Sequence, residues 1–116
     1  DDEALEMLAA TAETARRGHV GVLLPDVFRL MGEIHLQAGA LPQAEAAFDQ
    51  ALATARAQQA LSLELRAAMS RRALLARTGR AAEGLALVRR CYERFSDSFD
   101  QPELRAARAL LEGGER

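Results

Sequence analysis

Arginine is the commonest side chain in this sequence that could recognise another molecule. All 15 lysine-plus-arginine positions are arginines, and a guanidinium group binds carboxylates or phosphates through two parallel hydrogen bonds. A GC-rich genome also favours arginine over lysine, so arginine content alone predicts no ligand. Arg66 and Arg77 are spaced to lie on one helix face. We expect them to meet acidic groups of a partner, although an ordinary solvated helix face has the same composition.

The residues that could act in catalysis or metal binding form no recognisable constellation. Neither His19 nor His35 has a cysteine or carboxylate at metal-ligand spacing on a shared face. Cys91 has no histidine nearby in sequence and falls on an apolar stripe, so we expect a buried, unreactive thiol. The glutamates that could serve as acid or base are scattered, at Glu33, Glu64 and Glu83. We therefore expect no enzyme activity, no cofactor and no metal in this chain.

The composition favours one small helical domain in a reducing compartment. The 116 residues are 49 % hydrophobic but only 4 % aromatic, so small aliphatic side chains must build the core and let helices approach closely. A single cysteine cannot form an internal disulfide. No apolar run approaches the roughly 20 residues of a membrane span. We expect a cytoplasmic protein without membrane contact.

Charge is distributed unevenly along the chain. Residues 1–60 contain four arginines and nine acidic residues, whereas residues 61–116 contain eleven arginines and eight acidic residues. A pI near 5.7 argues against direct nucleic-acid binding. The chain begins at Asp1, within the helical pattern and without an initiator methionine, so we expect a fragment of a larger protein.

Apolar residues recur at helical spacing along the whole chain, and no segment alternates with the period of a strand. Glycine and proline mark helix boundaries, for example Gly39 and Gly79 at C-terminal ends and Pro42 at a first turn. Asp100, with Glu103 three residues later, has the pattern of a capping box. The short connections make consecutive helices antiparallel neighbours. We expect a single all-α domain of residues 1–116 with about six helices, at residues 2–17, 25–38, 42–57, 61–78, 81–95 and 101–112.

Two helical hairpins repeat at a spacing of 40 residues. Segments 32–39 and 72–79 each end in glycine and precede a second helix rich in Ala and Leu. The first hairpin resembles a tetratricopeptide repeat (TPR), whose motif positions fall on Phe28, Met31, Gly32, His35, Gly39, Ala44, Phe48 and Ala51. The resemblance implies antiparallel hairpins stacked as a short right-handed superhelix, with Gly32 allowing close helix crossing and Phe48 filling the space between helices.

The second hairpin departs from this motif at three positions. Arg72 stands where a small residue is expected, and Gly84 and Cys91 stand where alanines are expected. Leu75 and Val88 still fit the motif. We therefore expect the second hairpin to pack with a shifted register or a wider angle.

Three stretches give a narrower resemblance. Residues 23–33, 62–68 and 99–104 are similar to segments of large bacterial signalling proteins. In that family a nucleotide cyclase (adenylate or guanylate) or a LuxR-type DNA-binding domain accompanies an ATPase module, and tetratricopeptide repeats close the chain. The resemblance spans about residues 4–112 and implies that this chain is the C-terminal region of a signalling or transcription-regulatory protein, without the cyclase or ATPase itself.

The first helix of each tetratricopeptide hairpin lines a concave face, so the resemblance implies that a protein or peptide, or a neighbouring domain, binds there. The residues of that face would be Arg29, Glu33, Leu36 and Gln37 on one helix and Arg66, Met69, Ala73 and Arg77 on the next.

Three functions stay open at this point. The first is a protein–protein interaction module, which an open groove would favour. The second is a small-ligand sensor that regulates an attached ATPase or cyclase, which an apolar pocket with converging polar groups would favour. The third is self-association as a homodimer, for which the N-terminal helix, lacking a partner of its own, offers Leu5, Met7 and Leu8.

Overall fold

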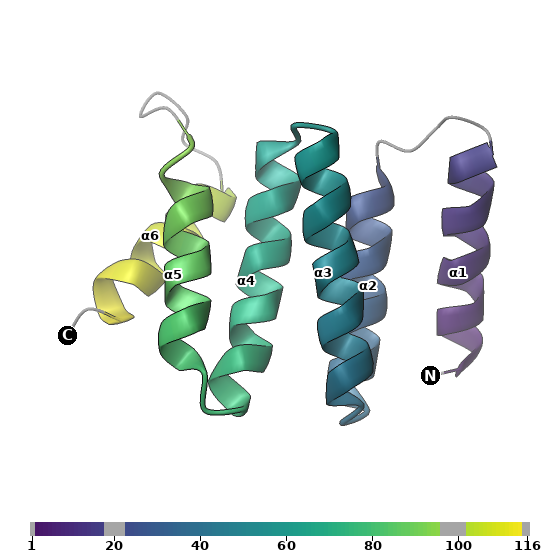
Figure 1. The fold of residues 1–116 in the computed structure, drawn as a ribbon, viewed down its shortest axis with the longest axis horizontal. Coiled ribbons are helices and arrows are strands. Elements are labelled where there is room, and N and C mark those ends of the chain that lie inside the picture. Colours follow the sequence, from purple (N-terminus) through teal and green to yellow (C-terminus); the bar gives the residue numbers. More distant parts are fainter. Residues whose placement is uncertain (1, 18–22, 96–101, 115–116) are drawn as a thin grey trace.

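Six α-helices follow one another as adjacent antiparallel pairs (Figure 1). The computed structural model describes residues 2–17, 23–95 and 102–114. These residues form only helices and turns, which confirms the all-α prediction, in a slab of 42 × 33 × 19 Å. The helices are α1 (Asp2–Arg17), α2 (Leu24–Gln37), α3 (Leu41–Ala57), α4 (Leu61–Arg77), α5 (Ala81–Tyr92) and α6 (Pro102–Gly114).

The helix boundaries differ from the prediction mainly towards the C-terminus. α5 ends at Tyr92 rather than residue 95, because the amides of Arg94 and Phe95 donate to carbonyls only three residues back. α6 continues through Gly114 instead of ending at residue 112, a difference within the fraying of helix ends. The capping box predicted at Asp100 lies outside the described residues.

Three interhelix turns share one backbone geometry. Gly39, Gln59 and Gly79 each have a positive φ, of 79°, 56° and 77°. The amide of the following residue donates to a carbonyl five residues back, at 2.9 Å after α2, 2.9 Å after α3 and 2.8 Å after α4. This is the hydrogen bond of a Schellman helix end. Hairpins α2–α3 and α4–α5 therefore turn in the same register, and the expected shift in register is not present at the second turn.

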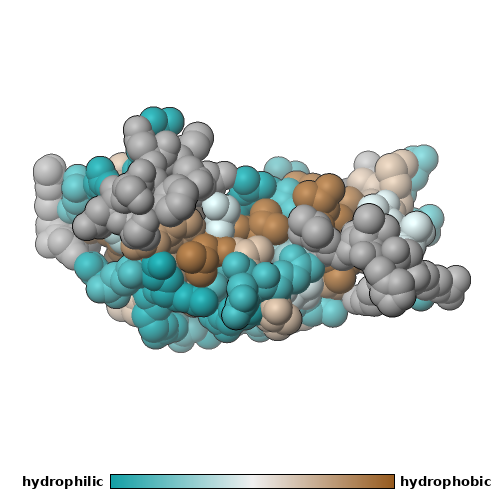
Figure 2. Space-filling model, turned by 90° about the horizontal axis from the view of Figure 1, so that it is seen from above, coloured by the Kyte–Doolittle hydropathy of each residue, from teal (hydrophilic) through white to brown (hydrophobic). Residues whose placement is uncertain are grey.

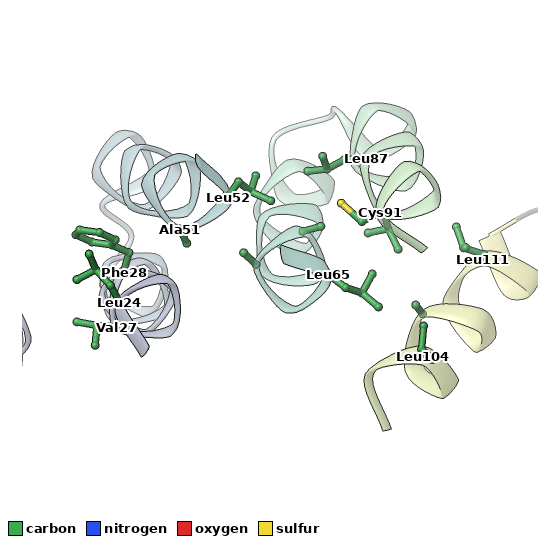
Figure 3. Close-up of a cluster of buried hydrophobic side chains, with 14 of the residues drawn as sticks. Leu24, Val27, Phe28, Ala51, Leu52, Leu65, Leu87, Cys91, Leu104 and Leu111 are labelled. Carbon is green, nitrogen blue, oxygen red and sulfur yellow. The ribbon is translucent and has the colours of Figure 1, made fainter. Parts of the chain in front are cut away.

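The core is built from small and aliphatic side chains of all six helices. Its main cluster includes Ala12 of α1, and Figure 3 shows Leu52 of α3 and Leu87 of α5 pointing toward each other, with Leu104 and Leu111 reaching in from α6. A second cluster fills the other end of the hairpins: Leu36, Ala44, Phe48, Leu74 and Leu75. Most of these residues contribute Ala- or Leu-sized groups, so the helices pack closely.

The two hairpins accommodate a large side chain at different places. In α2–α3, a Cβ added to Gly32 would overlap the ring of Phe48, which is completely buried. In α4–α5, a Cβ added to Gly84 would lie 2.9 Å from Cγ and 3.0 Å from Cα of Arg72. Arg72 therefore fits because its partner helix carries glycine at the point of contact. The two departures from the repeat motif at Arg72 and Gly84 compensate each other.

Helix neighbours repeat along the slab. α2 packs against α3 and α4, and α4 packs against α5 and α6, so each of these helices lies against the next two. Within the described residues α1 packs against α2 alone, at the edge of the slab (Figure 1). One flank of α1 and the adjoining flank of α2 are thus left without a covering helix.

Candidate functional site

The eight residues predicted for a binding face lie on α2 and α4, which pack side by side. They are Arg29, Glu33, Leu36 and Gln37 on α2 and Arg66, Met69, Ala73 and Arg77 on α4. Gln37 and Arg77 are exposed, whereas five of the others are half-buried. The two helices share one surface, but only parts of it are open to solvent.

Asp26 forms two ion pairs, one within α2 and one that joins α2 to α4. Arg29 Nε lies 2.9 Å from Asp26 Oδ1 within α2, and Arg66 Nη1 reaches the same oxygen from α4 at 3.3 Å. Partial burial acts to raise the pKa of Asp26, but the hydrogen bonds and positive charges of Arg29 and Arg66 outweigh burial and hold that pKa below its ordinary value. Both arginines are therefore already engaged by a carboxylate of their own chain.

Leu36 and Arg77 meet at the other end of the same two helices. Arg77 Nη1 donates a hydrogen bond to the Leu36 carbonyl oxygen at 3.2 Å. The Leu36 side chain is 7 % exposed and packs in the second core cluster, so little of it is accessible to a partner. Met69 also packs partly against the core. Two other residues of the predicted face lie outside these contacts: Gln37, which is exposed, and Glu33, which is half-buried.

Glu33 and Gln37 border an open groove of about 460 Å³ between α1 and α2. The apolar part of its lining comes from Ala4, Met7, Leu8, Leu30 and Ile34. Met7 and Leu30 are 66 % and 40 % exposed. The view from above shows hydrophobic side chains between hydrophilic ones at the other end of the helices, the end at which α2 begins (Figure 2). Large apolar side chains gathered in one groove, rather than scattered singly, are typical of a binding surface.

The polar part of the groove is acidic. Its polar lining residues are Glu3 on α1 and Glu33 and Gln37 on α2, and no arginine or histidine among the side chains that the structure describes lines it. Among the described residues neither Glu3 nor Glu33 forms an ion pair. The groove thus combines an apolar floor with two carboxylates that have no ion-pair partner among the described residues.

A buried carboxylate lies in the second hairpin, where the sequence showed only a scattered glutamate. Glu64, in the first turn of α4, is 3 % exposed. Arg56 Nε of α3 lies 2.8 Å from its Oε2, and Arg94 Nη1, just after α5, lies 2.5 Å from its Oε1. Two guanidinium groups therefore compensate the charge that burial would otherwise disfavour. The cluster ties α3, α4 and the end of α5 together.

Cys91 is the third neighbour of Glu64. Its thiol is 3 % exposed and donates to Glu64 Oε2 at 3.7 Å, which agrees with the prediction that it is a buried residue. Burial and the negative charge of Glu64 raise the pKa of Cys91 to about 11. The sulfur is therefore almost entirely protonated at neutral pH, and a protonated thiol is a poor nucleophile.

A second charge cluster crosses α3, α4 and α5. Arg71 lies 2.8 Å from both Glu45 and Asp49 and 3.6 Å from Glu83. Arg80 adds contacts with Glu45 at 3.2 Å and Glu83 at 2.6 Å, and its hydrogen bond lowers the pKa of Glu83. Two arginines thus pair with three carboxylates, and these ion pairs join α3, α4 and α5.

Within residues 2–17, 23–95 and 102–114, no group of three or more His, Cys, Asp or Glu side chains could hold a metal ion. No helix in these segments combines the length and apolar character needed to cross a membrane. His35 is half-buried in α2, and His19 lies outside the described residues.

Comparison of the chain with protein-family models, with curated proteins and with solved structures finds no match. The fold therefore stands as six helices in antiparallel pairs, and the site has to be judged from its own geometry.

Apolar residues beside the core-facing stripes of α1 and α2 mark the groove in the sequence, although helical periodicity alone does not distinguish them from other exposed apolar residues. Leu30 and Ile34 are four residues apart, beside the stripe that faces the core, and Met7 directly precedes the inward-facing Leu8. Such flanking apolar residues extend the stripe sideways towards a second neighbour. The groove also depends on the packing of α1, which covers only part of α2.

Proposed function

We propose that this chain is a protein–protein interaction module of the tetratricopeptide type, from the C-terminal region of a bacterial signalling or transcription-regulatory protein. The observation that carries the proposal is the open apolar groove between α1 and α2, which adjoins Glu33 and Gln37 of the predicted face. The two hairpins with identical turns, 40 residues apart, support the repeat assignment. The parent protein follows only from the sequence resemblance.

The direct test places a photo-crosslinking amino acid at Leu30, which lines the groove, and at Leu23 as a control. Leu23 is 68 % exposed and does not line the groove. We expect one protein to crosslink from Leu30 and not from Leu23 in the full-length parent, and to bind the purified chain with 1:1 stoichiometry. Equal crosslinking from both positions would contradict the proposal.

The arginines of the predicted face need a stability control. Replacing both Arg66 and Arg77 by Glu should weaken binding of an acidic partner. Arg66 contacts Asp26 and Arg77 contacts the Leu36 carbonyl, so the double variant also removes two contacts between α2 and α4. Binding is therefore to be compared only after the free energy of unfolding of each variant has been measured.

A small-ligand sensor is the second candidate, because about 460 Å³ lies within the usual range of small-molecule sites. Such sites usually bury most of the ligand surface, whereas this groove is open along one side. Native mass spectrometry of the purified parent distinguishes the two candidates: a co-purifying small molecule favours the sensor.

Self-association through α1 is the third candidate. Met7 is exposed, whereas Leu5 is half-buried and Leu8 packs partly against the core. Light scattering across a range of concentrations tests this contact. A dimer that dissociates in a Met7→Ser variant supports it.

A further inference from the structure

We propose that the α1–α2 groove binds an amphipathic helix of a partner protein, whose apolar stripe contacts Met7, Leu8, Leu30 and Ile34 and whose flanking Lys or Arg residues pair with Glu3 and Glu33. This inference rests on the proposed function and specifies the chemistry of the partner.

The shape of the occupant follows from the packing repeated inside the chain. α2 lies against α3 and α4, and α4 lies against α5 and α6. In both cases one helix fills the angle between the two helices that follow it. The α1–α2 groove is the equivalent angle one step earlier, and no described helix fills it. An added helix would thus have the same kind of surroundings as α2 and α4.

The apolar half of the recognition comes from side chains that the fold does not bury. Leu8 packs partly against the core, but Met7 and Leu30 are 66 % and 40 % exposed. Covering them removes apolar surface from water, which is the main driving force for helix docking. Methionine also adapts its shape to varied apolar partners.

The charged part of the recognition is inferred from a difference between the carboxylates of this groove and the other carboxylates of the molecule. Asp26, Glu45, Asp49, Glu64 and Glu83 all pair with arginines of the same chain. Glu3 and Glu33 form no such pair among the described residues, and nothing basic lines their groove. Cationic side chains on a partner would complement these carboxylates, which favours basic partners over acidic ones.

A second copy of this chain fits the groove poorly. Its α1 carries Asp2, Glu3 and Glu6, which would repel the same carboxylates. Its α6 carries Arg105 and Arg108, but the large apolar residues Leu104 and Leu111 of α6 are buried in its own core. These features argue against a second copy of this chain as the occupant of the groove.

The experiment uses three synthetic helical peptides of 14 residues, the length of α2. The first has leucines at i, i+4, i+7 and i+11 flanked by lysines. The second has glutamates in place of the lysines, and the third has the residues of the first in an order without a stripe. Binding of each peptide to the intact chain is measured by fluorescence anisotropy. We expect the lysine peptide to bind at least about tenfold more tightly than either of the others.

Two pairs of variants locate the binding. Leu30→Ser should weaken binding of the lysine peptide about tenfold, because a leucine contact is lost. Leu23→Ser, at a more exposed leucine outside the groove, should leave binding unchanged. Replacing both Glu3 and Glu33 by Gln should weaken it about fivefold and flatten its salt dependence. Glu93→Gln, at the C-terminal end of α5 and outside the groove, is a control for loss of a negative charge. Met7→Ser replaces Leu30→Ser if circular dichroism shows that the latter loses helicity.

The outcomes separate this inference from the proposed function. Equal binding of the lysine and glutamate peptides, weakened by Leu30→Ser, overturns the basic partner and leaves a helix-binding module. Binding that Leu30→Ser does not change, or no binding of any peptide, overturns the helix site. The proposed function would still be decided by the crosslink from Leu30.

Discussion

Hairpins α2–α3 and α4–α5 have the same turn geometry but solve the packing between their helices in opposite ways. At one crossing, α2–α3 has Gly32 on its first helix and the Phe48 ring on its second, where α4–α5 has Arg72 and Val88. The second hairpin restores space with Gly84, where the first has Ala44. A degenerate motif position is thus tolerated when the residue opposite changes with it.

A second difference lies at the other end of the hairpins. Leu24 and Ala51 belong to the main core cluster of the first hairpin. Forty residues later stand Glu64 and Cys91, and two arginines neutralise the carboxylate. This end of the first hairpin is therefore held by apolar contacts, and that of the second by ion pairs to a buried carboxylate. The two arrangements need not be equally sensitive to substitution.

The largest effect is expected from closing the space at Gly32. Gly32→Ala places a methyl group in the Phe48 ring, which is fully buried and cannot move aside. We expect a loss of about 3 kcal/mol in the free energy of unfolding, measured by urea denaturation. Combining it with Phe48→Val, the residue of the second hairpin, should cost less than the two single changes together. Additive losses would mean that the two residues do not compete for space.

Glu64 tests the buried carboxylate of the second hairpin. Glu64→Gln leaves Arg56 and Arg94 without their carboxylate, and we expect about 2 kcal/mol of destabilisation, less than for a fully buried pair because the arginine side chains are 51 % and 47 % exposed. Glu64→Leu, which copies Leu24 of the first hairpin, should cost less. If Leu is worse than Gln, the charge is needed for packing as well.

A double-mutant cycle tests whether Arg72 and Gly84 compensate each other. Gly84→Ala forces the helices apart at Arg72 and Arg72→Gly removes a helix-favouring side chain, so each should destabilise. Together they reproduce the Gly32–Ala44 arrangement of the first hairpin. We expect a favourable coupling energy of about 1 kcal/mol in thermal or urea unfolding. A coupling near zero would show that the contact is not limiting.

The smallest effect is expected at the turn between the hairpins. Gln59 has a φ of 56°, whereas the corresponding positions within the hairpins are Gly39 and Gly79. Gln59→Gly should stabilise the chain, because glycine adopts a positive φ without the steric cost that glutamine has. The greater entropy of glycine in the unfolded chain offsets part of this gain, so we expect a net stabilisation of about 0.5 kcal/mol. Gly39→Ala and Gly79→Ala should each destabilise it by about 1 kcal/mol. Calorimetry measures all three melting temperatures.

The helix bounds could be predicted from the sequence because they depend on local residue patterns. Apolar spacing and the glycines at 39 and 79 place α2 to α4 within about one residue of their observed bounds. The end of α5 was missed because its last hydrogen bonds change from four to three residues apart, which depends on geometry rather than on residue type.

The site was less predictable because it depends on contacts between distant residues. Arg66 and Arg77 were correctly placed on α4, but their partners Asp26 and Leu36 are about 40 residues away. Glu64 looked like one of several surface glutamates until Arg56 and Arg94 were brought around it. The α1–α2 groove depends on how little of α2 is covered by α1, which periodicity does not encode.

The single cysteine makes the stability of the second hairpin measurable at one atom. With 3 % exposure and a pKa of about 11, Cys91 should hardly react with alkylating reagents while the helices are closed. Opening of α4–α5 exposes the sulfur and returns its pKa towards the ordinary value of an exposed thiol, so modification then becomes fast. When reclosing outpaces modification, the alkylation rate is proportional to the open fraction. The rate of Cys91 alkylation, followed by mass spectrometry, therefore reports how often this hairpin opens, without an added label.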